Sequence, residues 1–85
     1  MKNLYVISDN DNGLRGVFTS KKNAFHAFID IANDSGQKDM KIYHEGKMRD
    51  FKPYMFRGSL IQIDFINEDG DRCEFTVEQI QANHY

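Results

Sequence analysis

The feature that most constrains the fold is a pair of alternating apolar runs separated by a short turn sequence. The runs are SLIQIDFIN, over residues 59–67, and DRCEFTVE, over residues 71–78, with Glu-Asp-Gly between them. Apolar side chains at every second position are typical of strands with one buried face, and a short connection containing Gly joins two such strands as a hairpin. The sequence therefore predicts an antiparallel hairpin here.

The length of the turn decides which side chains share a face. A two-residue turn would place Phe65 opposite Glu74, which mixes apolar and charged side chains on one face. A three-residue turn, with Gly70 in the left-handed conformation, pairs Asn67 with Asp71 and keeps one face apolar. We expect this second register. It pairs Phe65 with Cys73, Ile63 with Phe75, and Ile61 with Val77.

A second hairpin and a helix are expected in the first part of the chain. LYVIS (4–8) and LRGVF (14–18) are rich in β-branched and aromatic residues and stand on either side of five turn-forming residues. Apolar residues then recur with a helical period over KKNAFHAFIDIA (21–32), with Thr19 or Ser20 as the capping residue. The run Asn-Asp-Ser-Gly that follows is expected to end this helix.

The centre and the end of the chain are less regular. MKIYH (40–44) predicts a third strand, and EGKMRDFKPYMFRG (45–58) predicts a loop of 14 residues with room for a short strand inside it. The tail VEQIQANHY (77–85) fits either a continued strand or a short helical turn. Together the elements predict a single α+β domain over residues 1–85. We expect an antiparallel sheet of about five strands with one helix packed on a face, in the order β-β-α-β-β-β.

Composition narrows the class of protein. The chain has 85 residues and one cysteine, Cys73, so it cannot form an internal disulfide. Its apolar runs fall well short of the roughly 20 residues that cross a bilayer. We therefore expect a protein of the reducing cytoplasm that makes no contact with a membrane.

The stretch SDNDNGLRG (8–16) has the composition of a calcium loop but the wrong spacing. Starting the loop at Asp9 places glycine at its fifth position, whereas starting it at Ser8 leaves no aspartate among the ligands. Asn, Asp and Gly also favour hairpin turns, so we interpret this stretch as a turn. No cysteine or carboxylate lies at metal-ligand spacing from any of the three histidines. No pairing of a nucleophile with a base is visible either. We expect no metal, no cofactor and no enzymatic activity.

Charge is distributed unevenly along the chain, although the net charge is only −2. Residues 38–58 carry six basic and three acidic groups, and residues 59–85 carry one basic and six acidic groups. Within the basic part, cationic and aromatic side chains interleave. They are Lys47, Arg49, Phe51, Lys52, Tyr54, Phe56 and Arg57.

This basic-aromatic stretch, residues 47–57, has three interpretations. Its aromatic rings could fold under to seal a small core, it could bind a protein, or it could stack on the bases of RNA or single-stranded DNA. The overall pI of about 5.8 lacks the basic footprint that phosphate binding requires, so a protein partner is favoured over nucleic acid.

The acidic side chains of the last hairpin form the second candidate surface. Asp69 and Asp71 lie at its expected tip and Glu74 on its expected solvent face. Such a surface is either simply solvated or imitates a run of phosphates that enters a basic groove of another protein.

The first third of the chain resembles very small phage and prophage proteins of bacteria. The matching positions are Tyr5, Val6, Gly16, Val17, Phe18, Ser20 and Ala24. The resemblance implies an accessory protein that acts by binding in the host cytoplasm, inhibiting a host enzyme or a defence complex. The sequence hypothesis is thus a small non-enzymatic protein that binds another protein, with RNA or single-stranded DNA binding through the basic-aromatic stretch as the alternative. The oligomeric state stays open.

Overall fold

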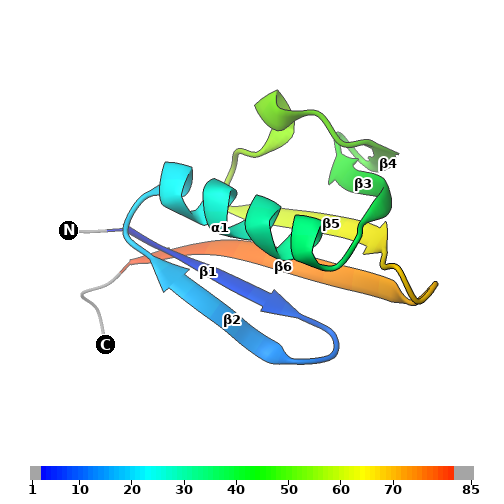
Figure 1. Cartoon of the computed structure of the whole chain (residues 1–85). Coiled ribbons are helices and arrows are strands. Elements are labelled where there is room, and N and C mark those ends of the chain that lie inside the picture. The colour runs from blue at the N-terminus through cyan, green and yellow to red at the C-terminus, as the bar shows by residue number, and fades with distance from the viewer. Residues whose placement is uncertain (1–2, 82–85) are drawn as a thin grey trace.

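The computed structural model describes residues 3–81, which form one helix laid on a six-stranded antiparallel sheet (Figure 1). The elements in chain order are β1 (Asn3–Asp9), β2 (Gly13–Phe18), α1 (Lys21–Asp34), β3 (Lys38–His44), β4 (Lys47–Asp50), a 3₁₀ helix (Pro53–Met55), β5 (Leu60–Ile66) and β6 (Arg72–Gln81). The strands lie side by side in the order β2-β1-β6-β5-β3-β4. The predicted α+β class is confirmed, with six strands where about five were expected.

The predicted helix is confirmed together with its cap. The Ser20 hydroxyl accepts a hydrogen bond from the Asn23 N–H at 3.1 Å, which satisfies one of the free donors of the first turn. The helix ends at Asp34 with Ser35 as its C-cap, and Gly36 follows with φ +67°. A Cβ atom at Gly36 would lie 2.9 Å from the Cβ of Glu68, so both the conformation and the space at this position require glycine.

The last hairpin has the predicted three-residue turn and the predicted register. Gly70 has φ +86°, and the Asn67 N–H donates to the Asp71 carbonyl at 2.9 Å. The Asn67 side-chain oxygen accepts from the N–H groups of Asp69 and Asp71, each at 2.9 Å, and so holds the turn. The pairs formed are Phe65 with Cys73, Ile63 with Phe75, and Ile61 with Val77. Strand β6 continues to Gln81; the rest of the ambiguous tail lies outside the described residues.

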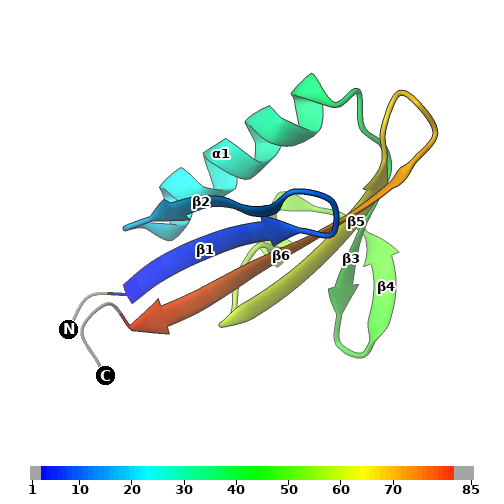
Figure 2. The ribbon, with the colours of Figure 1, turned by 90° about the horizontal axis from the view of Figure 1, so that it is seen from below.

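The core lies between α1 and the sheet and is built around one aromatic ring. Phe28 is fully buried, with its ring centre 5.4 Å from that of Phe75, 6.2 Å from that of Phe56 and 6.4 Å from those of Phe51 and Phe65. Centroid separations of this size are normal for packed aromatic pairs. Because α1 stands over only part of the sheet, β3 and β4 extend beyond it (Figure 2).

The segment 45–58 contains the short strand for which the sequence prediction left room, together with a 3₁₀ helix, so much of it is regular structure rather than loop. Glu45 and Gly46 have φ of +53° and +82° and join His44 to its partner Lys47. Positive φ at both central residues is the geometry that matches the twist of a two-residue hairpin. Strand β4 reads KMRD, which has no apolar alternation, and therefore gives no strand signal in the sequence.

Candidate binding surface on the uncovered face of the sheet

The sheet has one face under the helix and one face that no described element covers (Figures 1 and 2). Cross-strand partners share a face, and neighbours along a strand alternate between faces. Ile7, Val77 and Ile61 form a row across three strands and are buried under the helix. The next row on the other side runs from Val17 through Val6 and Glu78 to Leu60.

Exposed apolar side chains gather on this uncovered face. Seven large apolar residues among those described are exposed, and six of them lie there by alternation and pairing. These six are Leu14, Val17, Tyr43, Met48, Leu60 and Ile80. Scattered apolar residues are normal on a protein surface, whereas a concentration on one face is typical of an interaction site.

A row of charged side chains crosses the same face beside the apolar residues. It runs Glu74, Asp64, Lys41, Asp50 across four strands. Lys41 hydrogen-bonds Asp50, and this bond together with the charge of Asp50 raises the pKa of Lys41 above its ordinary value. Arg72 donates to Asp64 at 2.5 Å.

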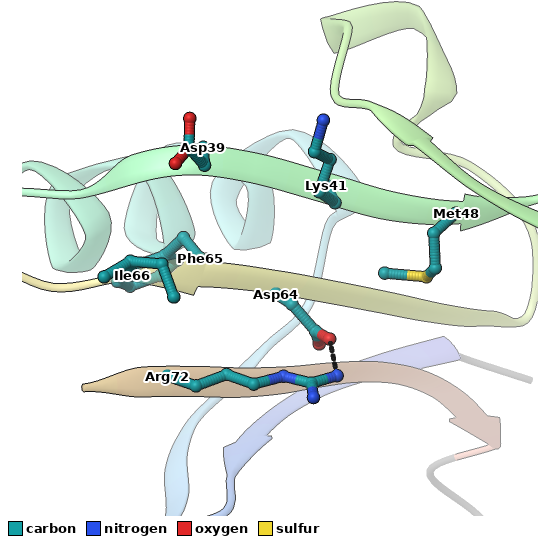
Figure 3. Close-up of a pocket in the computed structure, with 7 residues that line it drawn as sticks. All are labelled: Asp39, Lys41, Met48, Asp64, Phe65, Ile66 and Arg72. Carbon is teal, nitrogen blue, oxygen red and sulfur yellow. Dashed lines mark hydrogen bonds and ion pairs between the residues drawn. The ribbon is translucent and has the colours of Figure 1, made fainter. Parts of the chain in front are cut away.

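Two adjoining hollows, of about 310 and 280 Å³, open on this charged part of the face. They share Met48, Asp64 and Arg72. Figure 3 shows the first of them: Asp64 points from β5 toward Arg72 on β6, and Met48 reaches from β4 toward Asp64. Both volumes are at or below the lower end of the range for small-molecule sites, so they suit single side chains of a partner better than a cofactor.

The basic-aromatic stretch does not form one surface. Phe56 is buried, with 6% of its surface exposed, and its ring centre lies 5.1 Å from that of Phe25. Phe51 is half-buried and stacks on Phe25 at 6.4 Å. These two rings seal the core, so they are not offered to a partner; Tyr54, at 67% exposure, is the aromatic ring of this stretch that stays on the surface.

The four cations of the stretch, Lys47, Arg49, Lys52 and Arg57, are exposed. Along β4, Lys47 and Arg49 alternate with Met48, so they lie on the opposite side of the sheet from the hollows. Arg49 donates to the His44 carbonyl at 3.2 Å. It also forms an ion pair with Glu45 at 3.9 Å. Lys47 and Arg49 therefore lie away from Asp64 and Glu74 on the uncovered face.

The acidic candidates divide between two places. Asp69 and Asp71 are exposed at the tip of the hairpin, as predicted, while Glu74 lies on the uncovered face and lines the second hollow. The apolar residues of this face were not predicted, because the sequence pattern was used to assign only the side of each strand that packs in the core. In LRGVF, for example, Val17 alternates with the half-buried Phe18 and so had to face the other way.

The stretch SDNDNGLRG is a hairpin turn held by Asp9. Its side chain accepts hydrogen bonds from the N–H groups of Asp11 and Asn12, at 2.8 and 2.6 Å, and from Arg15 at 2.6 Å. Desolvation, the largest single influence, raises the pKa of Asp9, but the hydrogen bonds together outweigh it and lower that pKa below its ordinary value. Both carboxylate oxygens of Asp9 are thus engaged within the turn.

Among residues 3–81, no group of three or more His, Cys, Asp and Glu side chains is arranged to hold a metal ion. Within the same part of the chain, no helix has the length and apolar character needed to cross a membrane. Comparisons with protein-family models, curated proteins and solved structures find no match to this chain. The geometry of the surface therefore carries the functional argument.

Proposed function

We propose that this protein is a small non-enzymatic binding protein that recognises another protein through the uncovered face of its sheet. The observation that carries the proposal is the concentration of six exposed large apolar side chains on that one face. In water such a surface is costly, and a partner that covers it gains from the burial.

The composition of the face favours a protein as the partner. Tyr43 and Met48 belong to residue types that are enriched in interface cores, and they pair directly across β3 and β4. The charged row beside them supplies the polar groups that surround an interface core. The resemblance of the first third of the chain to small phage proteins supports a host enzyme or defence complex as the partner, with inhibition as the result of binding.

The test combines capture with surface substitutions. This protein is used as bait to capture a partner from a lysate of its host cells, and the partner is identified by mass spectrometry. The Kd of the complex is then measured for the parent and for the variants Leu60→Asp, Val17→Asp and Tyr54→Ser. Leu60 and Val17 lie on the uncovered face, whereas Tyr54 lies in the basic-aromatic stretch. We expect the two aspartate variants to weaken binding at least tenfold and Tyr54→Ser to leave it unchanged. The reverse pattern would move the site to the basic-aromatic stretch.

RNA or single-stranded DNA binding is the second candidate, supported by the exposure of Tyr54 and of the cations of the basic-aromatic stretch. With Phe51 and Phe56 in the core, one exposed ring is left in the stretch for stacking on bases. Phosphate binding is strongly salt-dependent, so a fluorescence titration with a labelled oligonucleotide in rising salt tests this candidate. Tight binding at low salt that falls steeply with salt would favour it.

A further inference from the structure

We propose that the hollows on the uncovered face accept an arginine or lysine side chain from an apolar, basic segment of the partner protein. This inference rests on the proposed function and names the chemistry of the partner.

The charged side chains that line the first hollow balance, with Asp39 and Asp64 against Lys41 and Arg72. Lys41 hydrogen-bonds Asp50, and the charge of Asp39 also acts on it. Asp39 lines the same hollow as Lys41. Lys41 thus serves two carboxylates.

The second hollow is lined by one cation and two carboxylates, an excess of one negative charge. Arg72 pairs with Asp64, and the charge of Glu74 also acts on Arg72. All three residues line this hollow. Together the two hollows are lined by two cations and three carboxylates, an excess of one negative charge, which attracts a cation from a partner.

Arg72 shows where such a cation would sit. Its side chain is 64% exposed, while the side chain of Asp64 beneath it is 18% exposed. Exposed ion pairs contribute little to stability, so a partner cation can displace Arg72 from Asp64 at small cost. Arg72 is therefore an internal competitor for the site.

Apolar side chains beside the hollows indicate the residues that should flank the cation in the partner's segment. Met48 and Ile66 line the first hollow, and the exposed side chains of Tyr43 and Leu60 lie on the same face. The partner segment that places a cation in the hollow should therefore also carry apolar side chains that cover these exposed apolar residues.

A second copy of the chain fits this face poorly. Glu78 lies between Val6 and Leu60 in the apolar row, and the hollows carry excess negative charge. Two copies packed face to face would bury these carboxylates against each other, which is costly without a counter-charge. A basic partner supplies that counter-charge.

The probe for the test is a labelled nine-residue peptide in which Arg alternates with Leu. The control peptide has citrulline in place of Arg, which keeps the shape and removes the charge. Fluorescence anisotropy measures affinity, and ¹⁵N-labelled protein locates the bound peptide by chemical-shift changes. We expect the Arg peptide to bind, with shifts concentrated at Met48, Asp64, Arg72 and Glu74, and the citrulline peptide to bind much more weakly.

Two pairs of variants separate a site from a general charge effect. Glu74→Lys should abolish binding of the Arg peptide, whereas the same change at Asp30, exposed on α1, should not. Arg72→Ala should tighten binding roughly two- to fivefold because it removes the competitor, whereas Lys22→Ala, which changes the net charge equally, should not.

Several outcomes would overturn the inference. They are unchanged or weaker binding in Arg72→Ala, equal tightening in Lys22→Ala, shifts centred on α1 or on residues 51–57, or sedimentation equilibrium that shows two copies sharing this face. If the peptide fails to bind while Leu60→Asp still abolishes capture of the cellular partner, this inference fails and the proposed function stands.

Discussion

Replacing Phe56 by alanine should destabilise the fold strongly, although for this stretch the sequence left a buried role and a binding role both open. The Phe56 ring packs on Phe25 at 5.1 Å and on Phe28 at 6.2 Å and is 6% exposed. Truncating a buried Phe to Ala costs about 3–5 kcal/mol. Because Phe56 lies at the margin of the core, beside the 3₁₀ helix, we expect about 3 kcal/mol, the lower end of that range.

This loss can be measured because the domain should survive it. A domain of this length is expected to have a free energy of unfolding of roughly 4–13 kcal/mol. A loss of about 3 kcal/mol lowers Tm by roughly 12–24 °C and the urea midpoint by about 1–3 M. The assay is urea and thermal unfolding followed by circular dichroism, with Tyr54→Ala as the matched control, expected within about 0.5 kcal/mol of the parent. Coincident midpoints for Phe56→Ala and the parent would refute the assignment of this ring to the core.

Three further predictions concern the turns and the thiol. Gly70→Val should cost about 1–3 kcal/mol because φ is +86° there, and Gly70→Asn clearly less; equal denaturant midpoints for the two would contradict this. Asp9→Asn should lower the free energy of unfolding at pH 7 on the order of 1 kcal/mol. Because the folded pKa of Asp9 is lowered, the difference in free energy of unfolding between variant and parent should be fully present above about pH 5 and should shrink as the pH falls through that pKa. A difference that does not change with pH would refute the role of the charge. Burial raises the pKa of Cys73, so a thiol reagent at pH 8 should label the native protein more slowly than the urea-unfolded chain, and equal rates would argue against burial.

Local patterns predict most of the fold. The hairpin register followed from requiring one apolar face, and the same logic placed Phe65, Ile63 and Phe75 in the core, where they are buried. Cys73 is only half-buried, since it lies next to the turn, near the tip of this hairpin. The cap at Ser20 followed from its position before the helical period.

Two features were left open by the sequence because they depend on contacts between distant segments. Strand β4 has no apolar alternation, and its pairing with β3 rests on the turn at Glu45 and Gly46. The burial of Phe51 and Phe56 depends on where α1 places Phe25 and Phe28. The sequence shows that basic and aromatic residues interleave, but the tertiary packing decides which of them reach solvent.

The uncovered face was predictable in principle. Once the packed side of each strand is assigned, the other side follows by alternation, and it contains Leu60 and Val17. The sequence does not show which face of the sheet α1 covers or whether another element covers the second face. A second covering element would have buried the same residues.

The most direct test of the uncovered face as the binding surface is site-specific photocrosslinking. A photoreactive phenylalanine analogue is placed at Leu60 on that face, at Asp30 on the exposed side of α1, or at Tyr54 in the basic-aromatic stretch, and each variant is irradiated with the captured partner. We predict a crosslink to the partner from Leu60 and none from Asp30 or Tyr54. A crosslink from Asp30 or Tyr54, with none from Leu60, would contradict the assignment.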